Sequence, residues 1–308
     1  MKELEITKTT VIAPAKINFI LKVLGSQNDG FHQVENLMQA IDLSDTVNIW
    51  WASRTTGEIS PKDGKLVEPG IDVDLIPGKD FLPSSSSNLA YKAAILMHEK
   101  FHANIKDIVK IEVGKNIPVA AGLAGGSADG AAVITGLCRL WHIDWRECMD
   151  LAKMLGSDVP FSLLSQNGFF AALATGTGTD LEIVSPTDAK VIIYNGGYPV
   201  STKEVYENWT EKDSHPSSCK DFLNASSLAE KTKYMGNDLD FPACRCFERV
   251  STDLNLLKSL ADNALIVQLS GSGPTVFAVF NSDDSFDEEK IKFLNKNKAF
   301  CTVCKTLC

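Results

Sequence analysis

Residues 118–132 read PVAAGLAGGSADGAA and place glycines at 122, 125 and 126, directly before Ser127. Residues 111–113 before this stretch are typical of the end of a strand, and residues 128–140 after it favour a helix. Glycines permit a tight turn and a close approach to a ligand, and a helix start offers free N–H groups and a positive dipole end. The stretch therefore predicts a phosphate-binding loop, in which Ser127 either caps the helix or offers its hydroxyl to a phosphate or a magnesium ion.

The same glycine cluster could also be a simple turn before a helix. It does not match the two common phosphate-binding patterns, because no Lys-Ser or Lys-Thr follows the glycines and the G-x-G-x-x-G spacing is absent. A nucleotide site must therefore be supported by other parts of the chain.

The composition narrows the class of protein. The chain has 308 residues, of which 44% are hydrophobic, and this is enough for one large or two ordinary domains. The net charge of −9 makes a nucleic-acid partner unexpected, because proteins that bind nucleic acids usually carry a basic excess. A small anionic substrate is compatible with this charge, since local donors decide such binding.

The cysteines and the apolar segments predict a cytoplasmic protein. Eight cysteines are scattered along the chain, a distribution that suits reduced thiols better than a disulfide framework. Cys301, Cys304 and Cys308 lie close together, but no second pair of ligands accompanies them for a zinc site. Lys16 and Lys22 interrupt the first apolar run, so no signal peptide is expected. No segment reaches the length of a membrane span, so we expect no membrane partner.

The first half of the chain alternates strands and helices. Residues 9–13 and 17–24 are expected to be two strands, and residues 46–51 a third. Residues 33–42 could be strand or helix, and residues 54–80 are expected to form a surface loop. Ser84–Ser87 and Asn88 supply N-caps for a helix that buries Ala90, Ala93, Ala94, Met97 and Phe101.

This helix also contains a rival motif, His98-Glu99-Lys100-Phe101-His102. The motif matches H-E-x-x-H, in which two histidines one turn apart bind zinc and the glutamate acts as a base. No third ligand motif follows it, so a metalloprotease is kept only as an alternative.

The second half repeats strands and helices around a further glycine-rich turn. Helix is expected at residues 145–155, and strand at residues 169–173. Beyond a boundary near Asp180, strands are expected at residues 190–195, 264–269 and 276–280, with helices near residues 203–209 and 240–262. The last two strands enclose Ser270-Gly271-Ser272-Gly273-Pro274. Asp158, between a helix end and Pro160, is either a turn residue or, given its apolar neighbours, a partly buried carboxylate.

Three segments together resemble the three motifs of the GHMP kinases. They are PAKIN at residues 14–18, PVAAGLAGGSADGAA at residues 118–132 and LSGSGP at residues 269–274, in the order of that family. PAKINFIL, DGFH at residues 29–32 and GSDVPF at residues 156–161 resemble the member that acts in the non-mevalonate route to isoprenoid precursors. That member phosphorylates a cytidine diphosphate-linked polyol. Phe31 stands where the family usually has tyrosine, so a hydrogen bond from that position is lost.

The resemblance implies an α+β fold with two domains. An N-terminal ATP-binding domain would span residues 1–180, and a C-terminal ferredoxin-like domain would span residues 181–308, with the active site in the cleft between them. The reaction implied is transfer of the ATP γ-phosphoryl group to the 2-hydroxyl of the polyol, with Mg²⁺ bridging phosphate oxygens. We expect a monomer or a weak homodimer.

The resemblance also implies roles for individual residues. Asp158 would accept the proton of the attacking hydroxyl, and Lys16 beside it would keep it ionised. Phosphate and adenine contacts are expected from Pro118, Ala120, Ala121, Gly122, Leu123, Ala124, Gly125, Gly126, Ser127 and Leu89, with Ser127 also as a metal ligand. Substrate contacts are expected from Asn18, Phe31, His32, Thr202, Tyr206, Gly271, Ser272 and Gly273.

Two further alternatives remain open. A sister kinase of the homoserine or mevalonate type would share the three glycine-rich motifs and differ in its substrate residues. A non-catalytic binding protein could share the fold, but the presence of both Lys16 and Asp158 argues against it.

Overall fold

The chain, as a computed structural model, divides into two compact units, and we describe each by itself. The structure describes residues 5–26, 32–54, 56, 67–79, 81–286, 288–295 and 299–308. Unit 1 comprises Met1–Ala13, Ser44–Asn116 and Gly126–Asn167, and unit 2 comprises Pro14–Leu43, Ile117–Gly125 and Gly168–Cys308. The strands β1 (Thr7–Ser26) and β2 (His32–Arg54) contribute residues to both units. The domain boundary near residue 180 stays a prediction.

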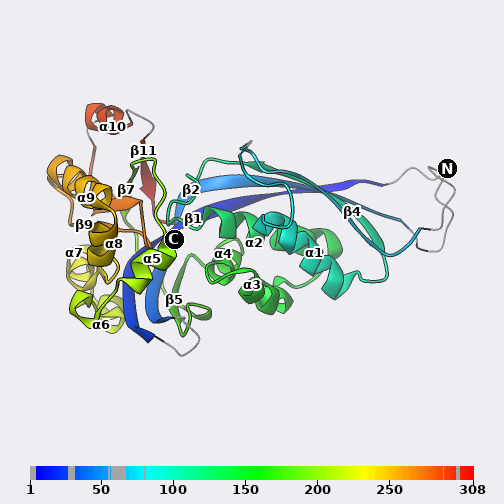
Figure 1. Cartoon of the computed structure of the whole chain (residues 1–308), viewed down its shortest axis with the longest axis horizontal. Coiled ribbons are helices and arrows are strands. Elements are labelled where there is room, and N and C mark those ends of the chain that lie inside the picture. The colour runs from blue at the N-terminus through cyan, green and yellow to red at the C-terminus, as the bar shows by residue number, and fades with distance from the viewer. Residues whose placement is uncertain are drawn as a thin grey trace. The chain divides into compact units, whose positions relative to one another are not determined.

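Unit 1 is a layer of strands with helices on one face (Figure 1). The strand order is β3-β4-β2-β1, in which β3 (Gly70–Ile76) runs parallel and β2 antiparallel to β4 (Lys106–Gly114). The helical segments are α1 (Leu89–Phe101), α2 (Gly125–Trp141), η1 (Trp145–Cys148), α3 (Met149–Leu155) and α4 (Val159–Ser165).

Small side chains bring these helices close to the strands. Ala90, Ala93 and Ala94 of α1 are fully buried in one apolar core with Ile49 and Ile111 of the strands. The Asn88 side chain accepts a hydrogen bond from Ala90 N at 2.9 Å, so the predicted N-cap is confirmed. The predicted buried face is confirmed for Ala90, Ala93, Ala94 and Met97, whereas Phe101 is only partly buried.

Unit 2 contains a second sheet, with all neighbouring strands antiparallel, in the order β11-β7-β10-β9. Its strands are β7 (Lys190–Asn195), β9 (Ile266–Leu269), β10 (Val276–Phe280) and β11 (Phe300–Lys305). The unit 2 part of β2 pairs with β5 (Ala171–Thr175), which pairs with β6 (Asp180–Ile183), and β1 pairs with β8 (Gly236–Asn237).

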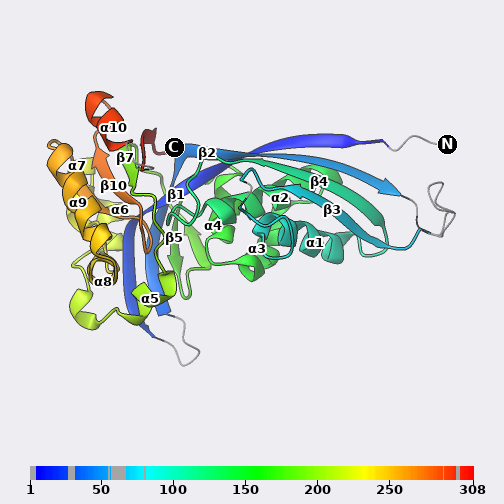
Figure 2. The ribbon, with the colours of Figure 1, turned by 45° about the horizontal axis from the view of Figure 1, so that its top comes forward.

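Helices lie beside the second sheet (Figure 2). The helical segments of unit 2 are α5 (Thr202–Glu207), η2 (Glu211–Asp213), α6 (Cys219–Asn224), α7 (Leu228–Lys231), η3 (Thr232–Tyr234), α8 (Asp240–Cys246), α9 (Glu248–Leu260) and α10 (Glu288–Leu294). Val250, Leu254 and Leu257 of α9 share an apolar core with Ala278 and Phe280 of β10. The predicted α+β class is confirmed by both units.

Several expected boundaries are wrong. Residues 9–13 and 17–24 form one strand, because Pro14 is accommodated without breaking β1. The ambiguous residues 33–42 belong to β2, and the supposed loop at residues 54–80 contains β3. The GSDVPF segment opens a short helix, α4, with Pro160 in its first turn. Within the described ranges, no helix combines the length and apolarity needed to cross a membrane.

Candidate active site

The glycine-rich stretch forms a tight loop between β4 and α2. Gly122 has a φ of 74°, and a Cβ built on it would lie 2.3 Å from the Ser270 carbonyl oxygen and 2.9 Å from that of Gly273. A side chain cannot fit there, so glycine is required at this position. Ala120 and Ala124 also have positive φ angles, of 53° and 59°.

Ser127 is not the N-cap of α2, which was one of its two expected roles. The helix begins at Gly125, so Ser127 lies in its first turn and is not the residue that precedes and caps it. A Cβ built on Gly126 would meet no atom within 4 Å, so this turn borders open space. N–H groups of a first helical turn have no partner within the helix, and α2 carries no acidic residue in that turn. An anion therefore fits against this turn.

Unit 2 brings together residues of the three predicted motifs, which are far apart in sequence. A Cβ on Gly271 would lie 3.4 Å from the Gly122 carbonyl oxygen, 3.5 Å from Lys16 Nζ and 3.7 Å from Asn18 Oδ1. The Lys16 ammonium donates to Asn18 Oδ1 at 2.8 Å. The Ser270 hydroxyl donates to the Gly122 carbonyl at 3.0 Å, which ties the second glycine-rich turn to the first.

A cluster of rings lies in the same unit. The His32 ring lies 5.1 Å from the Tyr206 ring and 6.3 Å from the Trp209 ring, centroid to centroid. The Thr202 and Ser272 hydroxyl oxygens are 2.7 Å apart. The structure thus groups the predicted His32 with Tyr206, and Thr202 with Ser272, whereas Phe31 lies outside the described residues.

Asp158 and Leu89 are in unit 1. Asp158 is half-buried directly before α4, and its carboxylate does not cap that helix. Its neighbours Val159 and Pro160 are buried, which agrees with the prediction that Asp158 is a partly buried carboxylate. Leu89 packs against the unit 1 core, 3.1 Å from the place that a Cβ on Gly130 would take.

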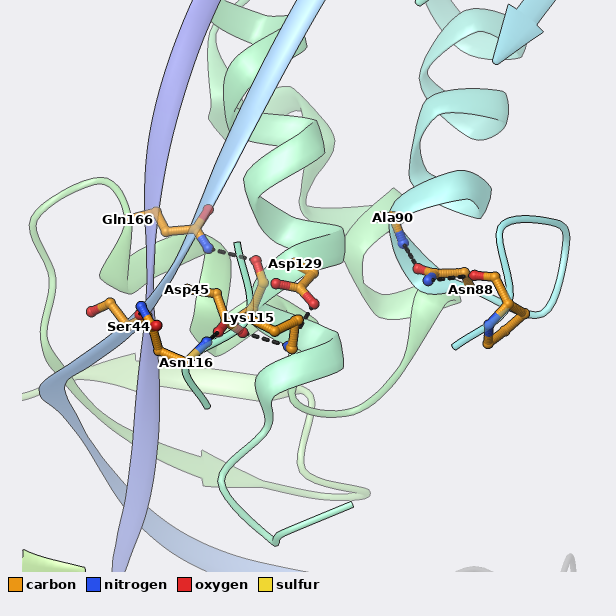
Figure 3. A network of polar contacts seen from close by, with 10 residues as sticks. Ser44, Asp45, Asn88, Ala90, Lys115, Asn116, Asp129 and Gln166 are labelled. Carbon is orange, nitrogen blue, oxygen red and sulfur yellow. Dashed lines mark hydrogen bonds and ion pairs between the residues drawn. The ribbon is translucent and has the colours of Figure 1, made fainter. Parts of the chain in front are cut away.

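A buried ion network in unit 1 was not predicted (Figure 3). Lys115 Nζ contacts Asp45 Oδ2 and donates to Asp129 Oδ2 at 2.8 Å. The side chains of Lys115, Asp45 and Asp129 are only 3%, 0% and 9% exposed. Lys115 precedes the glycine-rich loop and Asp129 follows it, so their ion pair joins the chain before the loop to the chain after it.

Burial and the neighbouring opposite charges shift the pKa values of Lys115 and Asp129 in opposite directions. Burial raises the pKa of the Asp129 carboxyl above its ordinary value, although the Lys115 ammonium works against that shift. Burial alone would lower the pKa of Lys115, but the Asp129 and Asp45 carboxylates outweigh it and raise that pKa. The lysine therefore stays charged, and its ammonium lies within ion-pair distance of both carboxyl groups.

The H-E-x-x-H motif has a structural explanation. The Nδ1 atoms of His98 and His102 each lie 2.9 Å from the same oxygen, Asp107 Oδ2. The His102 ring also stacks on Trp141 at 3.9 Å. In the described part of the chain, no group of three or more His, Cys, Asp or Glu side chains could hold a metal ion.

We expect Gly126→Val to raise the KM for ATP about tenfold, equivalent to about 1.4 kcal/mol of binding. The added side chain has room in the fold but would occupy the space beside the first turn of α2. Steady-state kinetics and thermal melting would measure this. An unchanged KM for ATP in a normally folded variant would show that the loop has a structural role only.

Comparisons with known proteins point to one family. Residues 88–166 match the family model for the GHMP kinases N terminal domain. The chain is 35% identical over 300 residues to 4-diphosphocytidyl-2-C-methyl-D-erythritol kinases of Bacillus cereus (strain B4264) and Bacillus anthracis (strain CDC 684 / NRRL 3495). These alignments cover 96% of this chain and 94% of each relative.

Solved structures agree with this result. The crystal structure of a 4-(cytidine 5'-diphospho)-2C-methyl-D-erythritol kinase matches with a TM-score of 0.74 and 26% identity, covering 97% of this chain and 100% of that one. A homoserine kinase from Cytophaga hutchinsonii matches with a TM-score of 0.61 and 14% identity, covering 100% of this chain and 96% of that one. The second likeness concerns the fold alone.

Proposed function

This chain belongs to the GHMP kinases, and from that premise we propose that it transfers the γ-phosphoryl group of ATP to the 2-hydroxyl of 4-diphosphocytidyl-2-C-methyl-D-erythritol. The observation that carries the proposal is the convergence of the three motifs in unit 2. Lys16 Nζ and the Gly122 carbonyl oxygen both lie within 3.5 Å of the Cβ position of Gly271. Phosphoryl transfer depends mainly on positioning and charge neutralisation, and this cluster supplies a cation beside two glycine-rich turns.

The phosphates of ATP would bind along residues 118–127. Backbone N–H groups of this loop and of the first turn of α2 would donate to phosphate oxygens. Mg²⁺, where bound, would neutralise phosphate charge, and the Ser127 hydroxyl fits as one of its oxygen ligands. Leu89 stays a prediction for the adenine site.

Asp158 and Lys16 are the proposed catalytic residues. Asp158 would accept the proton of the attacking hydroxyl. Its half-buried position suits this role, and its carboxylate is not used as the N-cap of α4. The Lys16 ammonium would draw charge from the transferring group. Asn18 would hold the lysine and contact the substrate.

The cytidine end of the substrate would bind at the ring cluster. Tyr206 would stack on the base, His32 would read its edge, and Thr202 with Ser272 would supply hydroxyl groups. Phe31 stays a prediction for a contact with the substrate. Trp209 joins the predicted residues because its ring lies 6.3 Å from that of His32.

Phosphorus NMR after incubation with ATP, Mg²⁺ and the cytidyl substrate tests the proposal. A new phosphomonoester signal is expected, and it should vanish in the Lys16→Met variant. A parallel screen with homoserine and mevalonate distinguishes the sister kinases. Phosphorylation of one of those alcohols, without reaction of the cytidyl substrate, would overturn the substrate assignment and leave the family intact.

Cellular location and assembly are also proposed. All eight cysteines are free thiols, which is compatible with the predicted cytoplasmic location. Light scattering would test whether the protein is a monomer or a weak homodimer.

We expect Tyr206→Ala to raise the KM for the cytidyl substrate about 5- to 150-fold, since stacking on a base is worth about 1–3 kcal/mol. Tyr206→Phe should be nearly silent because stacking uses the ring. The KM for ATP should barely change in either variant. Equal weakening of both substrates, or a large loss of thermal stability, would make Tyr206 a packing residue.

A further inference from the structure

Three buried polar side chains form a hydrogen-bonded line in unit 2. Lys16 Nζ donates to Asn18 Oδ1 at 2.8 Å, and Asn18 Nδ2 donates to Asn36 Oδ1 at 2.7 Å. Their exposed fractions are 4%, 0% and 8%. Lys16 and Asn18 are two residues apart on β1 and therefore point to the same face, and Asn36 comes from the neighbouring strand, β2. Asn36 has no role in the proposed function so far.

The chemistry of the line fixes the orientation of each amide. A lysine ammonium only donates, so Asn18 must present its oxygen to Lys16 and direct its NH₂ group away. That NH₂ group is buried and needs an acceptor, which Asn36 Oδ1 provides. If the Asn18 amide rotated by half a turn, its NH₂ group would face the ammonium and its oxygen would face the oxygen of Asn36.

The backbone at Asn18 is also held by hydrogen bonds. Gln268 Nε2 donates to the carbonyl oxygens of Asn18 and Phe19 at 2.9 and 3.0 Å. The Ser270 hydroxyl approaches Asn18 Oδ1 at 3.4 Å. With the backbone held, the Asn18 side chain can still rotate about its two side-chain bonds, and the hydrogen bond to Asn36 opposes rotation of the amide.

We infer that Asn36 is a positioning residue that holds the Asn18 amide in the orientation that places the Lys16 ammonium for phosphoryl transfer. This inference rests on the proposed function, in which Lys16 is catalytic. The lysine ammonium sits on a flexible four-carbon stem, so its place depends on the groups that receive its hydrogen bonds. Small displacements of a catalytic group cost rate more than affinity.

The test compares two buried amides on β2. Asn36→Leu removes the acceptor at nearly constant size, and we expect kcat to fall about tenfold with the KM for ATP within about twofold. Asn36→Asp keeps an acceptor oxygen and should restore most of kcat. Gln39→Leu is the matched control, because Gln39 is 1% exposed and bonds to Leu307 and Thr187, which are not part of the line. The control should melt lower but keep its kcat.

A double-mutant cycle separates action through Asn18 from independent action. In an Asn18→Ala background, Asn36→Leu should cause no further loss of kcat. Additive losses, or an equal fall of kcat in Gln39→Leu, would overturn the inference.

A second readout does not depend on turnover. The side-chain amide hydrogens of Asn18, followed by NMR, should exchange faster in Asn36→Leu and stay protected in Gln39→Leu. Unchanged protection in Asn36→Leu would overturn the inference even if the wild-type enzyme phosphorylates the cytidyl substrate. A wild-type enzyme that phosphorylates no alcohol, with the amide protected as expected, would instead refute the proposed function and with it the catalytic part of the inference.

Discussion

Replacement of Asp158 by asparagine is expected to lower kcat at least about 10²-fold, the lower end of the contribution of a general base. Asparagine has nearly the same shape but cannot accept the proton of the attacking hydroxyl. The KM for ATP should change little, because the phosphates are proposed to bind along the glycine-rich loop. The thermal stability should change little, because asparagine has nearly the same size as aspartate and the position is half-buried.

A matched control is available in the same unit. Asp144 precedes η1 and accepts a hydrogen bond from Arg146 N at 3.0 Å, so it has the capping role that Asp158 lacks. Asp144→Asn should leave kcat unchanged, because asparagine is also a good N-cap. Near wild-type turnover in purified Asp158→Asn would remove Asp158 from the mechanism, whereas a loss in both variants would indicate a general effect on unit 1.

Local sequence signals predicted the regular elements best. The α1 helix has a polar N-cap at Asn88 and alanines at helical spacing, and these features are sufficient to define its start and its buried face. The strand β1 shows the limit of local signals. Pro14 normally argues against a strand interior, yet β1 continues through it. The strand β3 was missed for a different reason. Ile71, Val73 and Leu75 alternate with exposed residues, as in a strand, but the glycines, prolines and charges of residues 54–80 favoured the prediction of a loop.

The sequence allowed candidate site residues to be proposed where they belong to motifs. The glycine-rich stretches, Lys16 and Asn18 could be recognised because the chemistry depends on residues adjacent in sequence. Asn36 could not, because its partner Asn18 lies 18 residues away on another strand. The signal available in the sequence was an asparagine directly before the apolar residues Leu37 and Met38. The sequence did not decide whether residues 33–42 form a strand or a helix.

The H-E-x-x-H motif shows the opposite error. Two histidines one helical turn apart are suited to a metal, but they are equally suited to one carboxylate. Asp107 is fully buried and lies within 2.9 Å of both rings. Only the contact with Asp107 of β4 distinguishes these two possibilities, and it cannot be seen in the sequence. A metalloprotease therefore remained an alternative at the level of the sequence, and the geometry of these residues does not support it.

The second large effect is expected from Lys115→Met, which should lower the free energy of unfolding by about 3–5 kcal/mol. The variant keeps the aliphatic stem but leaves the Asp45 and Asp129 carboxylates buried beside each other without a cation. Among the residues that the structure describes, none donates a hydrogen bond to the buried Asp129 Oδ1. Urea unfolding, with the midpoint and the m value both measured, would detect the change.

The exposed pair Lys106–Asp72 offers the control for Lys115→Met. Its ammonium and carboxylate are 2.6 Å apart, but the side chains are 23% and 65% exposed. Water screens this pair, so Lys106→Met should cost at most about 1 kcal/mol. Adding Asp129→Asn to Lys115→Met should recover part of the lost stability, because the buried site then holds one carboxyl group instead of two. Equal costs for Lys115→Met and Lys106→Met would show that the buried carboxylates are compensated by other means. The ion pair would then not be what holds together the two chain segments that flank the glycine-rich loop.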